Sequence, residues 1–288
     1  MVFLMSAFII LLLAALFIYG RLIEPDKIQI QTIHVKSDPI NTALKGKKIV
    51  HISDLHLSKF GKREIKILET IEHINPDLIF LTGDYIKWQG NINPALKFLS
   101  SLKAEYGVFA VMGDYDYSNS RASCLFCHER GKTQFTKQHK VIMLRNSSRE
   151  ITLNDQNIEI AGMDEGYDDS FIFKNSVFED SVAENNIMEK HEKFEDNNSL
   201  KLVLSHSPLA FDQFSDKDNI LMFAGDTHGG QVKLPLWLFK ILGYKKNVKY
   251  NYGLFKNGNK TMYVTRGTGT SHFKFRLFCP PEIAVFEF

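Results

Sequence analysis

The sequence has few cysteines, little net charge, and neither an internal repeat nor a low-complexity tract. Three cysteines in 288 residues are too few for a disulfide scaffold, and their number is odd. The 35 Lys and Arg and the 33 Asp and Glu give a formal charge of +2, which excludes bulk charge as the route to a nucleic acid. We therefore expect no nucleic-acid partner, and no obligate protein partner is evident. A content of 44% apolar residues is typical of a globular chain of one large or two modest domains.

Charge is also absent from one long N-terminal stretch. Residues 2–19 are 18 consecutive uncharged residues, nearly all apolar. As a helix they would be about 27 Å long. The hydrocarbon core of a bilayer is roughly 30 Å thick, so residues 1–20 are predicted to form a single-pass membrane anchor.

Two other interpretations compete with this anchor. A secretory signal peptide would have Lys or Arg before the apolar run and a clean small-residue cleavage site after it, and the sequence has neither. A buried helix of a soluble domain seldom lacks polar positions on every face. The nearby Arg21, Lys27 and Lys36 all follow the run, which favours a catalytic domain on the cytoplasmic side of the membrane.

The rest of the chain is predicted to be a linker with a first strand, residues 21–46, followed by one domain, residues 47–288. The expected strands are 28–35, 47–53, 77–83, 107–113, 141–144, 158–163, 200–206, 220–226, 261–267 and 282–288, and the expected helices are 63–74 and 94–102. This order predicts a layered α/β sandwich. Residues 164–198 hold eleven Asp and Glu against three Lys, which is typical of a solvated acidic insertion.

Five short polar motifs stand at the carboxyl ends of predicted strands. They are Ser53-Asp54-Leu55-His56, Gly83-Asp84, Gly113-Asp114-Tyr115-Asp116, Ser205-His206-Ser207-Pro208 and Gly225-Asp226-Thr227-His228-Gly229-Gly230. In open α/β sheets, ligands gather where the strands end and the loops begin. Carboxylates and imidazoles that converge there are stable only if a cation lies between them. The five motifs together therefore predict a metal site.

These motifs resemble those of the calcineurin-like metallophosphoesterases, whose pattern is D-x-H, G-D, G-N-H-D, H and G-H-x-H. The resemblance extends from about residue 47 to the end of the chain. It implies a four-layer αββα sandwich that holds two metal ions. The stretches GDTHGGQVKLP and RGTGT…RLFCPPEI look like a membrane-anchored bacterial branch of the family. That branch includes enzymes similar to the UDP-2,3-diacylglucosamine pyrophosphatases of lipid A synthesis.

The resemblance also implies a set of metal ligands. Asp54, His56 and His228 would hold the first ion, Asp84 would bridge both ions, and His206 would bind the second. Two such ions can clamp a phosphate oxygen and acidify a water that attacks the phosphorus in line.

Two further ligand positions depart from the family pattern. Asp114 replaces an Asn, and Asp226 replaces the first His of G-H-x-H. Both changes make the second site more anionic, which favours Mn²⁺ or Mg²⁺ over Zn²⁺. Mn²⁺ is the first expectation, and Mg²⁺, Fe²⁺ and Zn²⁺ are the alternatives.

A third departure concerns catalysis. Tyr115 stands where the resemblance implies a His that protonates the leaving group, and Asp116 keeps the last position of that motif. An unperturbed His has a pKa of about 6.5 and a Tyr one of about 10, so Tyr is the poorer proton donor near neutrality. The substitution therefore favours a leaving group that needs little help, such as the phosphate of a pyrophosphate. Impaired catalysis is the alternative.

Three lesser features leave alternatives open. A haem-attachment pattern is matched by Cys124, Cys127 and His128. The alternatives are a small zinc site that these residues form with His139, and a reduced or disulfide-linked loop. Arg266, His272 and Arg276 are either phosphate contacts or ordinary surface residues. The apolar block 236–242 with the lysines that follow it is either a lipid-docking segment or a core helix.

The sequence thus predicts a membrane-anchored, dinuclear metal-dependent hydrolase of a phosphoester or pyrophosphate bond. Its expected substrate is a phosphorylated small molecule or lipid, such as a nucleotide-linked lipid. The alternatives are a phosphomonoesterase or phosphoprotein phosphatase of the same fold, and a metal-binding scaffold of low activity.

Overall fold

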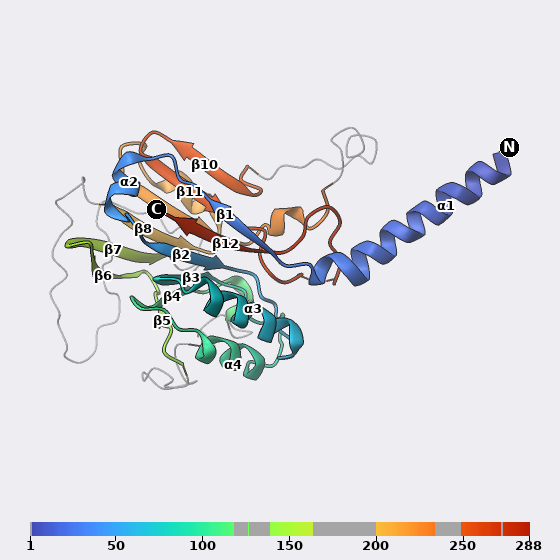
Figure 1. Ribbon diagram of the computed structural model, residues 1–288, viewed down its shortest axis with the longest axis horizontal. Helices are drawn as coiled ribbons and strands as arrows, with labels where there is room; N and C mark the ends of the chain where they lie inside the picture. The colour runs from blue at the N-terminus through green and yellow to red at the C-terminus, as the bar shows by residue number, and fades with distance from the viewer. Residues whose placement is uncertain (1, 118–125, 127–138, 164–199, 234–248, 272) are drawn as a thin grey trace.

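Two six-stranded sheets pack face to face in the computed structural model, and one long helix projects from the end of this sandwich (Figure 1). The structure describes residues 2–117, 126, 139–163, 200–233, 249–271 and 273–288. The predicted acidic insertion, the block 236–242, His272, Cys124, Cys127 and His128 lie outside these residues.

The first sheet combines both ends of the chain with the early strands. Its order is β1 (Gln29–Ile33), β12 (Glu282–Glu287), β2 (Lys48–Ile52), β3 (Leu78–Thr82), β4 (Val108–Val111) and β5 (Ile142–Met143). Only the β12–β2 pair is antiparallel. The predicted strand at 28–35 is therefore part of the sheet, where it pairs with β12.

The second sheet contains the later strands. Its order is β10 (Gly253–Asn257), β11 (Lys260–Val264), β9 (Ile220–Ala224), β8 (Lys201–Ser205), β7 (Gln156–Met163) and β6 (Ser147–Leu153). The central strands β7, β8, β9 and β11 are parallel, and β6 and β10 are antiparallel strands at the two edges. Each sheet thus brings the carboxyl ends of several parallel strands to one end.

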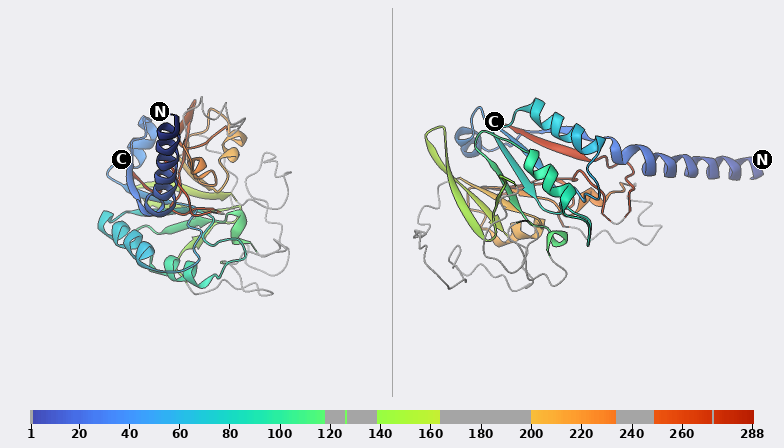
Figure 2. Two further views of the ribbon diagram at one scale, coloured as in Figure 1. Left: turned by 90° about the vertical axis from the view of Figure 1, so that its right-hand side faces the viewer. Right: turned by 90° about the horizontal axis from the view of Figure 1, so that it is seen from below.

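Helices α3 (Lys62–Ile74) and α4 (Asn93–Ser101) cover the outer face of the first sheet (Figure 2). The Glu64 carboxylate accepts the Gly61 N–H at the start of α3, at 2.9 Å. Ile67 and Ile71, one turn apart, are buried on the face toward the sheet. Asn75, with a φ of 50°, ends α3 in the left-handed region.

Aromatic side chains fill the space between the sheets. Phe80 of β3 lies edge to face with Phe223 of β9, with ring centroids 4.8 Å apart, and Phe286 of β12 packs on the same Phe223 ring at 5.0 Å. The 3₁₀ turn η4 (Pro208–Gln213) covers the outer face of the second sheet through the buried Phe211. The expected α/β sandwich is confirmed, although this outer layer is a short turn among the described residues.

Among the strands and α-helices of the described residues, β6, β10 and the short helix α2 (Asp38–Ala43) have no predicted counterpart. Both strands lie at sheet edges, and Leu153 is the one buried residue in them. Their sequences therefore lack the run of apolar residues that marks a buried strand.

The projecting helix α1 (Val2–Ile18) continues through a π-helical turn (Tyr19–Ile23) and a 3₁₀ turn (Glu24–Asp26). Residues 3–26 form a span that is long and apolar enough to cross a membrane, and its most apolar 18-residue window has a mean hydropathy of 2.5. Only 6% of its most apolar window is buried. This exposure contradicts the interpretation of the run as a core helix.

Candidate metal centre

The five predicted motifs converge where the parallel strands end. Their ligand residues share an unusual backbone conformation. Five of them have a positive φ: Asp54 (53°), His56 (45°), Asp84 (57°), Asp226 (69°) and His228 (51°). Left-handed conformations are costly for residues other than Gly, and they cluster at functional sites. These left-handed residues turn the chain sharply just after the strands, at the edge of the sheet where the ligand side chains lie.

A first group of ligands consists of Asp54, His56 and His228. Their ligand atoms all lie within 4.8 Å of one another, and all three residues are buried. The Nε2 atoms of the two imidazoles are 3.0 Å apart, and their rings stack with 14° between the planes. Nε2 of His228 lies 3.5 Å from Oδ1 of Asp54. Two imidazole nitrogens and a carboxylate oxygen thus face one point.

Asp84 connects this first group to a second one. Its Oδ2 lies 3.4 Å from Nε2 of His56, and its Oδ1 lies 3.7 Å from Nε2 of His206. Nδ1 of His206 makes a 2.6 Å hydrogen bond with the Thr82 carbonyl, which directs Nε2 toward Asp84. The Asp84 carboxylate therefore lies between the two groups, as a bridging ligand must.

The second group opens to solvent. Oδ1 of Asp114 and Oδ1 of Asp226 lie 3.9 Å and 4.0 Å from Nε2 of His206. Their side chains are 43% and 54% exposed, whereas that of His206 is 1% exposed. This side of the centre is the one that a substrate can reach.

Burial changes the protonation of these groups. It raises the pKa of Asp54 to about 6 and that of Asp84 well above its usual range, because both carboxylates lose water and crowd other acids. Burial, reinforced by nearby His206, lowers the pKa of His56 to about 3. A divalent cation binds neutral imidazoles and ionised carboxylates, and its charge would offset the desolvation that raises these carboxyl pKa values. The donor set therefore fits the metal ions that the sequence predicts.

Close approach explains two glycines of the motifs. A Cβ atom at Gly113 would overlap the Asp84 carboxylate, and one at Gly225 would overlap the Ser53 hydroxyl. Each G-D motif thus lets two strand ends come together over the metal centre.

Asp116, predicted as catalytic, has its carboxylate turned to the backbone. It is fully buried, and it accepts the N–H groups of Asp84 at 2.7 Å, Tyr85 at 2.8 Å and Gly113 at 3.0 Å. These bonds hold the turn that carries Asp84. Asp116 therefore positions a ligand and does not itself face the open side of the centre.

Tyr115 lies at the rim of the centre. Its N–H donates to Oδ1 of Asp84 at 3.1 Å, and its ring packs edge to face on His56, with centroids 5.0 Å apart. Partial burial and the nearby Asp114 raise the pKa of its hydroxyl, which makes it a still poorer proton donor. Trp88, 45% exposed, packs edge to face on Tyr115 and extends this rim. The only sequence signal for Trp88 is its place four residues after the Gly83-Asp84 motif.

The phosphate contacts predicted for Arg266 and Arg276 stay a prediction, and both side chains are buried and bonded within the protein. Nε of Arg266 donates to the Glu282 carboxylate at 2.6 Å inside the protein. Arg276 is 0% exposed and donates to backbone carbonyls. The Nε2 atom of His139 lies 3.3 Å from the Phe126 carbonyl, and the zinc site proposed for it stays a prediction because its partners lie outside the described residues.

Comparison with known proteins decides the family. A model of the calcineurin-like phosphoesterases matches residues 47–239, which is more than half of the chain. The chain belongs to the calcineurin-like phosphoesterase family. The predicted resemblance is thereby confirmed, and the protein is a hydrolase that acts on phosphoester bonds. Membership implies divalent metal ions.

Three relatives align over most of the chain. The metallophosphoesterase YkuE of Bacillus subtilis is 28% identical over 93% of this chain and 88% of its own length. The UDP-2,3-diacylglucosamine pyrophosphatase LpxG of Chlamydia muridarum is 27% identical over 93% of this chain and 91% of its own. The phosphodiesterase YaeI of Escherichia coli is 28% identical over 83% and 81%. The likeness thus extends beyond the family match toward both ends of the chain.

Proposed function

We propose that this protein is a membrane-anchored, dinuclear metal-dependent hydrolase that cleaves a phosphoester or pyrophosphate bond in a nucleotide-linked or lipid substrate. The observation that carries the proposal is the place of the Asp84 carboxylate. It lies 3.4 Å from His56 on one side and 3.7 Å from His206 on the other. A single carboxylate between two groups of ligands is the arrangement that a pair of divalent ions needs.

Each group would hold one ion. Asp54, His56 and His228 would bind the first, His206, Asp114 and Asp226 would bind the second, and Asp84 would be shared. Bound there, the ions neutralise phosphoryl charge and lower the pKa of a water. The oxygen-rich second group favours Mn²⁺.

The protein's own residues fix this arrangement. Asp116 holds the turn of Asp84 through three backbone N–H groups, and the Thr82 carbonyl sets the ring of His206. At the open rim, Tyr115 occupies the place of the general acid. Its raised pKa makes protonation of the leaving oxygen slow near neutral pH. A substrate whose leaving group is stable as an anion therefore suits the site best.

Similarity to LpxG supports a pyrophosphate-linked substrate, because that relative is a UDP-2,3-diacylglucosamine pyrophosphatase. The relative YaeI is a phosphodiesterase, so both kinds of bond occur among similar chains. Because Tyr115 is a weak proton donor, the site favours a pyrophosphate bond, whose leaving phosphate needs little protonation, over a simple alkyl ester.

The base of α1 supports a membrane location. Arg21 lies over the Phe273 ring at 4.8 Å, and Phe275 packs against both Phe273 and Phe17 of α1. Aromatic rings and cations at the end of an apolar helix are typical of a membrane–water interface. We place the catalytic domain on the cytoplasmic side, because the cations follow the apolar run.

The function is tested with the full-length protein in detergent, loaded with Mn²⁺. UDP-2,3-diacylglucosamine, a nucleotide diphosphate and a simple phosphomonoester are incubated with it separately, and products are measured beside the Asp84→Asn variant as an inactive control. We expect two ions per chain and release of a nucleoside monophosphate. Faster cleavage of the monoester would favour a phosphomonoesterase. Two bound ions without turnover would favour a metal-binding scaffold, which the Tyr115 substitution also allows.

A further inference from the structure

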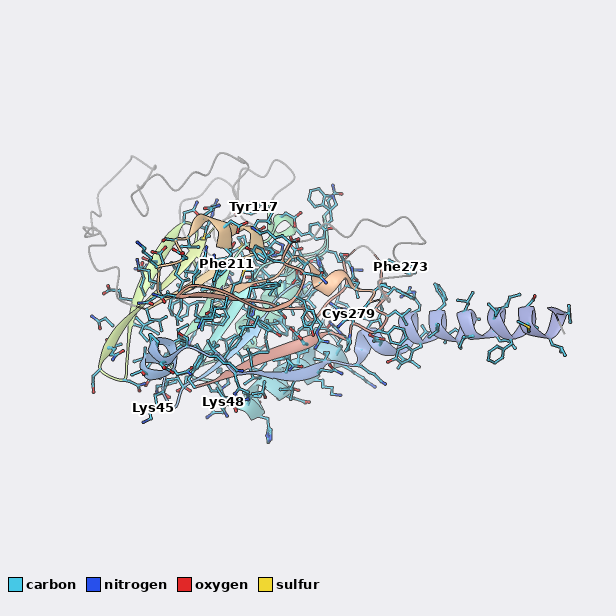
Figure 3. The ribbon with its side chains drawn as sticks, turned by 90° about the horizontal axis from the view of Figure 1, so that it is seen from above. Lys45, Lys48, Tyr117, Phe211, Phe273 and Cys279 are labelled. Atoms are coloured by element: carbon cyan, nitrogen blue, oxygen red, sulfur yellow. The ribbon has the colours of Figure 1, made fainter. Side chains whose placement is uncertain are left out.

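The segment that leaves α1 is buried against the loop behind the metal centre. Glu24 is only 1% exposed, and its carboxylate accepts the N–H groups of Phe278, at 2.9 Å, and of Cys279. Four residues earlier, the Gly20 carbonyl accepts the N–H of Arg276 at 2.9 Å. Figure 3 shows Phe273 and Cys279 at the end of the domain from which α1 projects. The residues that follow α1 thus hold the loop 276–279 by its backbone.

The Arg276 side chain links the loop 276–279 to a second loop, residues 266–269. Its Nε and Nη2 donate to the Gly269 carbonyl at 3.0 Å and 2.7 Å, and Nη2 also donates to the Arg266 carbonyl at 2.6 Å. Nη1 donates to the Cys279 carbonyl at 3.0 Å. The guanidinium therefore fastens the loop 266–269 to the loop that Glu24 holds.

Both loops contact ligands of the first metal group, namely Asp54 and His228. The Gly269 N–H donates to the Asp54 carbonyl at 2.7 Å, and a Cβ at Gly267 would lie 2.7 Å from Cβ of Asp54. On the other side, Nη2 of Arg276 lies 3.4 Å from Nδ1 of His228. With a metal on Nε2 of His228, Nδ1 would carry the hydrogen, so the guanidinium and the ring would be in van der Waals contact and not hydrogen-bonded.

We propose that Glu24 is a positioning residue for the first metal group. By holding the backbone of Phe278 and Cys279, it fixes Arg276, and through Arg276 it fixes His228 and the loop against Asp54. The segment between α1 and the first strand is then part of the metal centre. This inference rests on the proposed function, since it assumes that Asp54 and His228 bind an ion.

The chain offers a matched control two residues away. Asp26 belongs to the same turn and pairs with Lys274 at 2.7 Å, but its side chain is 47% exposed. An exposed ion pair contributes little to stability. Asp26→Ala removes an acid from the same segment without leaving a buried N–H group unpaired, whereas Glu24→Ala leaves the buried N–H of Cys279 and the partly buried N–H of Phe278 without their acceptor.

The test titrates Mn²⁺ into metal-free, full-length protein in detergent and resolves two dissociation constants. Residues that support ligands from outside typically change metal affinity by about 10- to 100-fold when mutated, so we expect Glu24→Ala to weaken one ion by that factor. The second ion and the Asp26→Ala variant should stay within about twofold of the unmodified protein. Glu24→Gln keeps one acceptor and should show a smaller loss. If Glu24→Ala does not fold, the metal affinities are measured on Glu24→Gln instead.

Two readouts separate positioning from general stability. Under the proposal, Glu24→Ala lowers kcat with little change in KM, and its effect on first-ion affinity is smaller in a His228→Ala background, where only the path through the loop against Asp54 remains. Equal weakening of both ions, or equal behaviour of the Glu24 and Asp26 variants, would overturn the inference while the proposed function stands. An unmodified protein that binds no Mn²⁺ would instead overturn the proposed function.

Discussion

The two groups of ligands in the metal centre differ in burial more than in chemistry. Asp54, His56 and His228 are 0%, 4% and 5% exposed, whereas the side chains of Asp114 and Asp226 are 43% and 54% exposed. The buried group keeps the residues of the family pattern, and the exposed group holds both substitutions. A buried ligand set is fixed by many neighbours, so it tolerates little change. An exposed set has room to change its metal preference and its substrate.

Asp84 lies between the two groups, so its loss should have the largest effect on the metal centre. Asp84→Asn should lower kcat by more than about 100-fold, beyond the usual cost of losing a supporting residue, because both ions lose a shared anionic ligand. Metal analysis should find fewer than two ions per chain. Asp226→Asn is the control and should cost much less, since that side chain serves one ion only. Equal, small losses in the two variants would show that Asp84 does not bridge.

Tyr115 lies between the groups, with its N–H on Asp84 and its ring on His56. If the general acid has been lost, the rate should fall steeply as the pKa of the leaving group rises. A general acid contributes about 10²–10⁴-fold, so Tyr115→His should rescue alkyl esters by at least about tenfold and nitrophenyl esters little. The measurement is a series of aryl and alkyl phosphodiesters on both proteins.

The unmodified protein supplies the decisive comparison within that series. A flat dependence on the leaving group would mean that Tyr115 or another side chain donates a proton after all. Failure of Tyr115→His to rescue, with a steep dependence retained, would mean that the new imidazole lacks an orienting partner. Asp116 cannot serve as that partner while it accepts three backbone N–H groups.

The sequence is informative about this centre because a metal ligand must be of a particular residue type at the end of a strand. Asp54, His56, Asp84 and His228 can therefore be selected from the sequence alone. The same reasoning does not reveal the structural role of Arg276, because an arginine near a phosphate site suggests a phosphate contact. Its guanidinium donates to the carbonyls of Arg266, Gly269 and Cys279. Its backbone N–H pairs with the Gly20 carbonyl, more than 250 residues earlier, and no local pattern reveals such a contact.

The strands also differ in how well the sequence predicts them. Buried strands such as β3 and β9 are continuous apolar runs, so their places can be predicted within one or two residues. The edge strands β6 and β10 owe their existence to pairing with a neighbour and not to burial. The left-handed turns at the ligand residues likewise follow from tertiary constraints, since neither Asp nor His requires a positive φ.

A smaller change tests whether the exposed group sets the metal. Asp226→His restores the residue type of the family and should shift preference from Mn²⁺ toward Zn²⁺ by about tenfold, or roughly 1.4 kcal/mol. Competition between the two metals, followed by elemental analysis, measures the shift. His206→Asp would be a poor control because that side chain is buried. Asp114→Asn is better, since it is exposed and keeps an oxygen ligand. An unchanged preference in Asp226→His would remove Asp226 from the ligand set.

The smallest effect on the centre is expected from removing α1 itself. Deleting residues 2–18 should transfer the protein to the soluble fraction and leave both Mn²⁺ affinities within about twofold, since Gly20 and Glu24 keep their contacts with the loop 276–279. A longer deletion, 2–27, removes those contacts and should weaken the first ion while sparing the second. Sedimentation followed by metal titration distinguishes the two deletions.

If the form without residues 2–18 stays in the membrane pellet, a second docking surface exists, and the block 236–242 is its candidate. If the full-length chain is itself soluble, the membrane anchor is wrong, whereas the difference between the two deletions would still measure how far the buried group depends on Glu24.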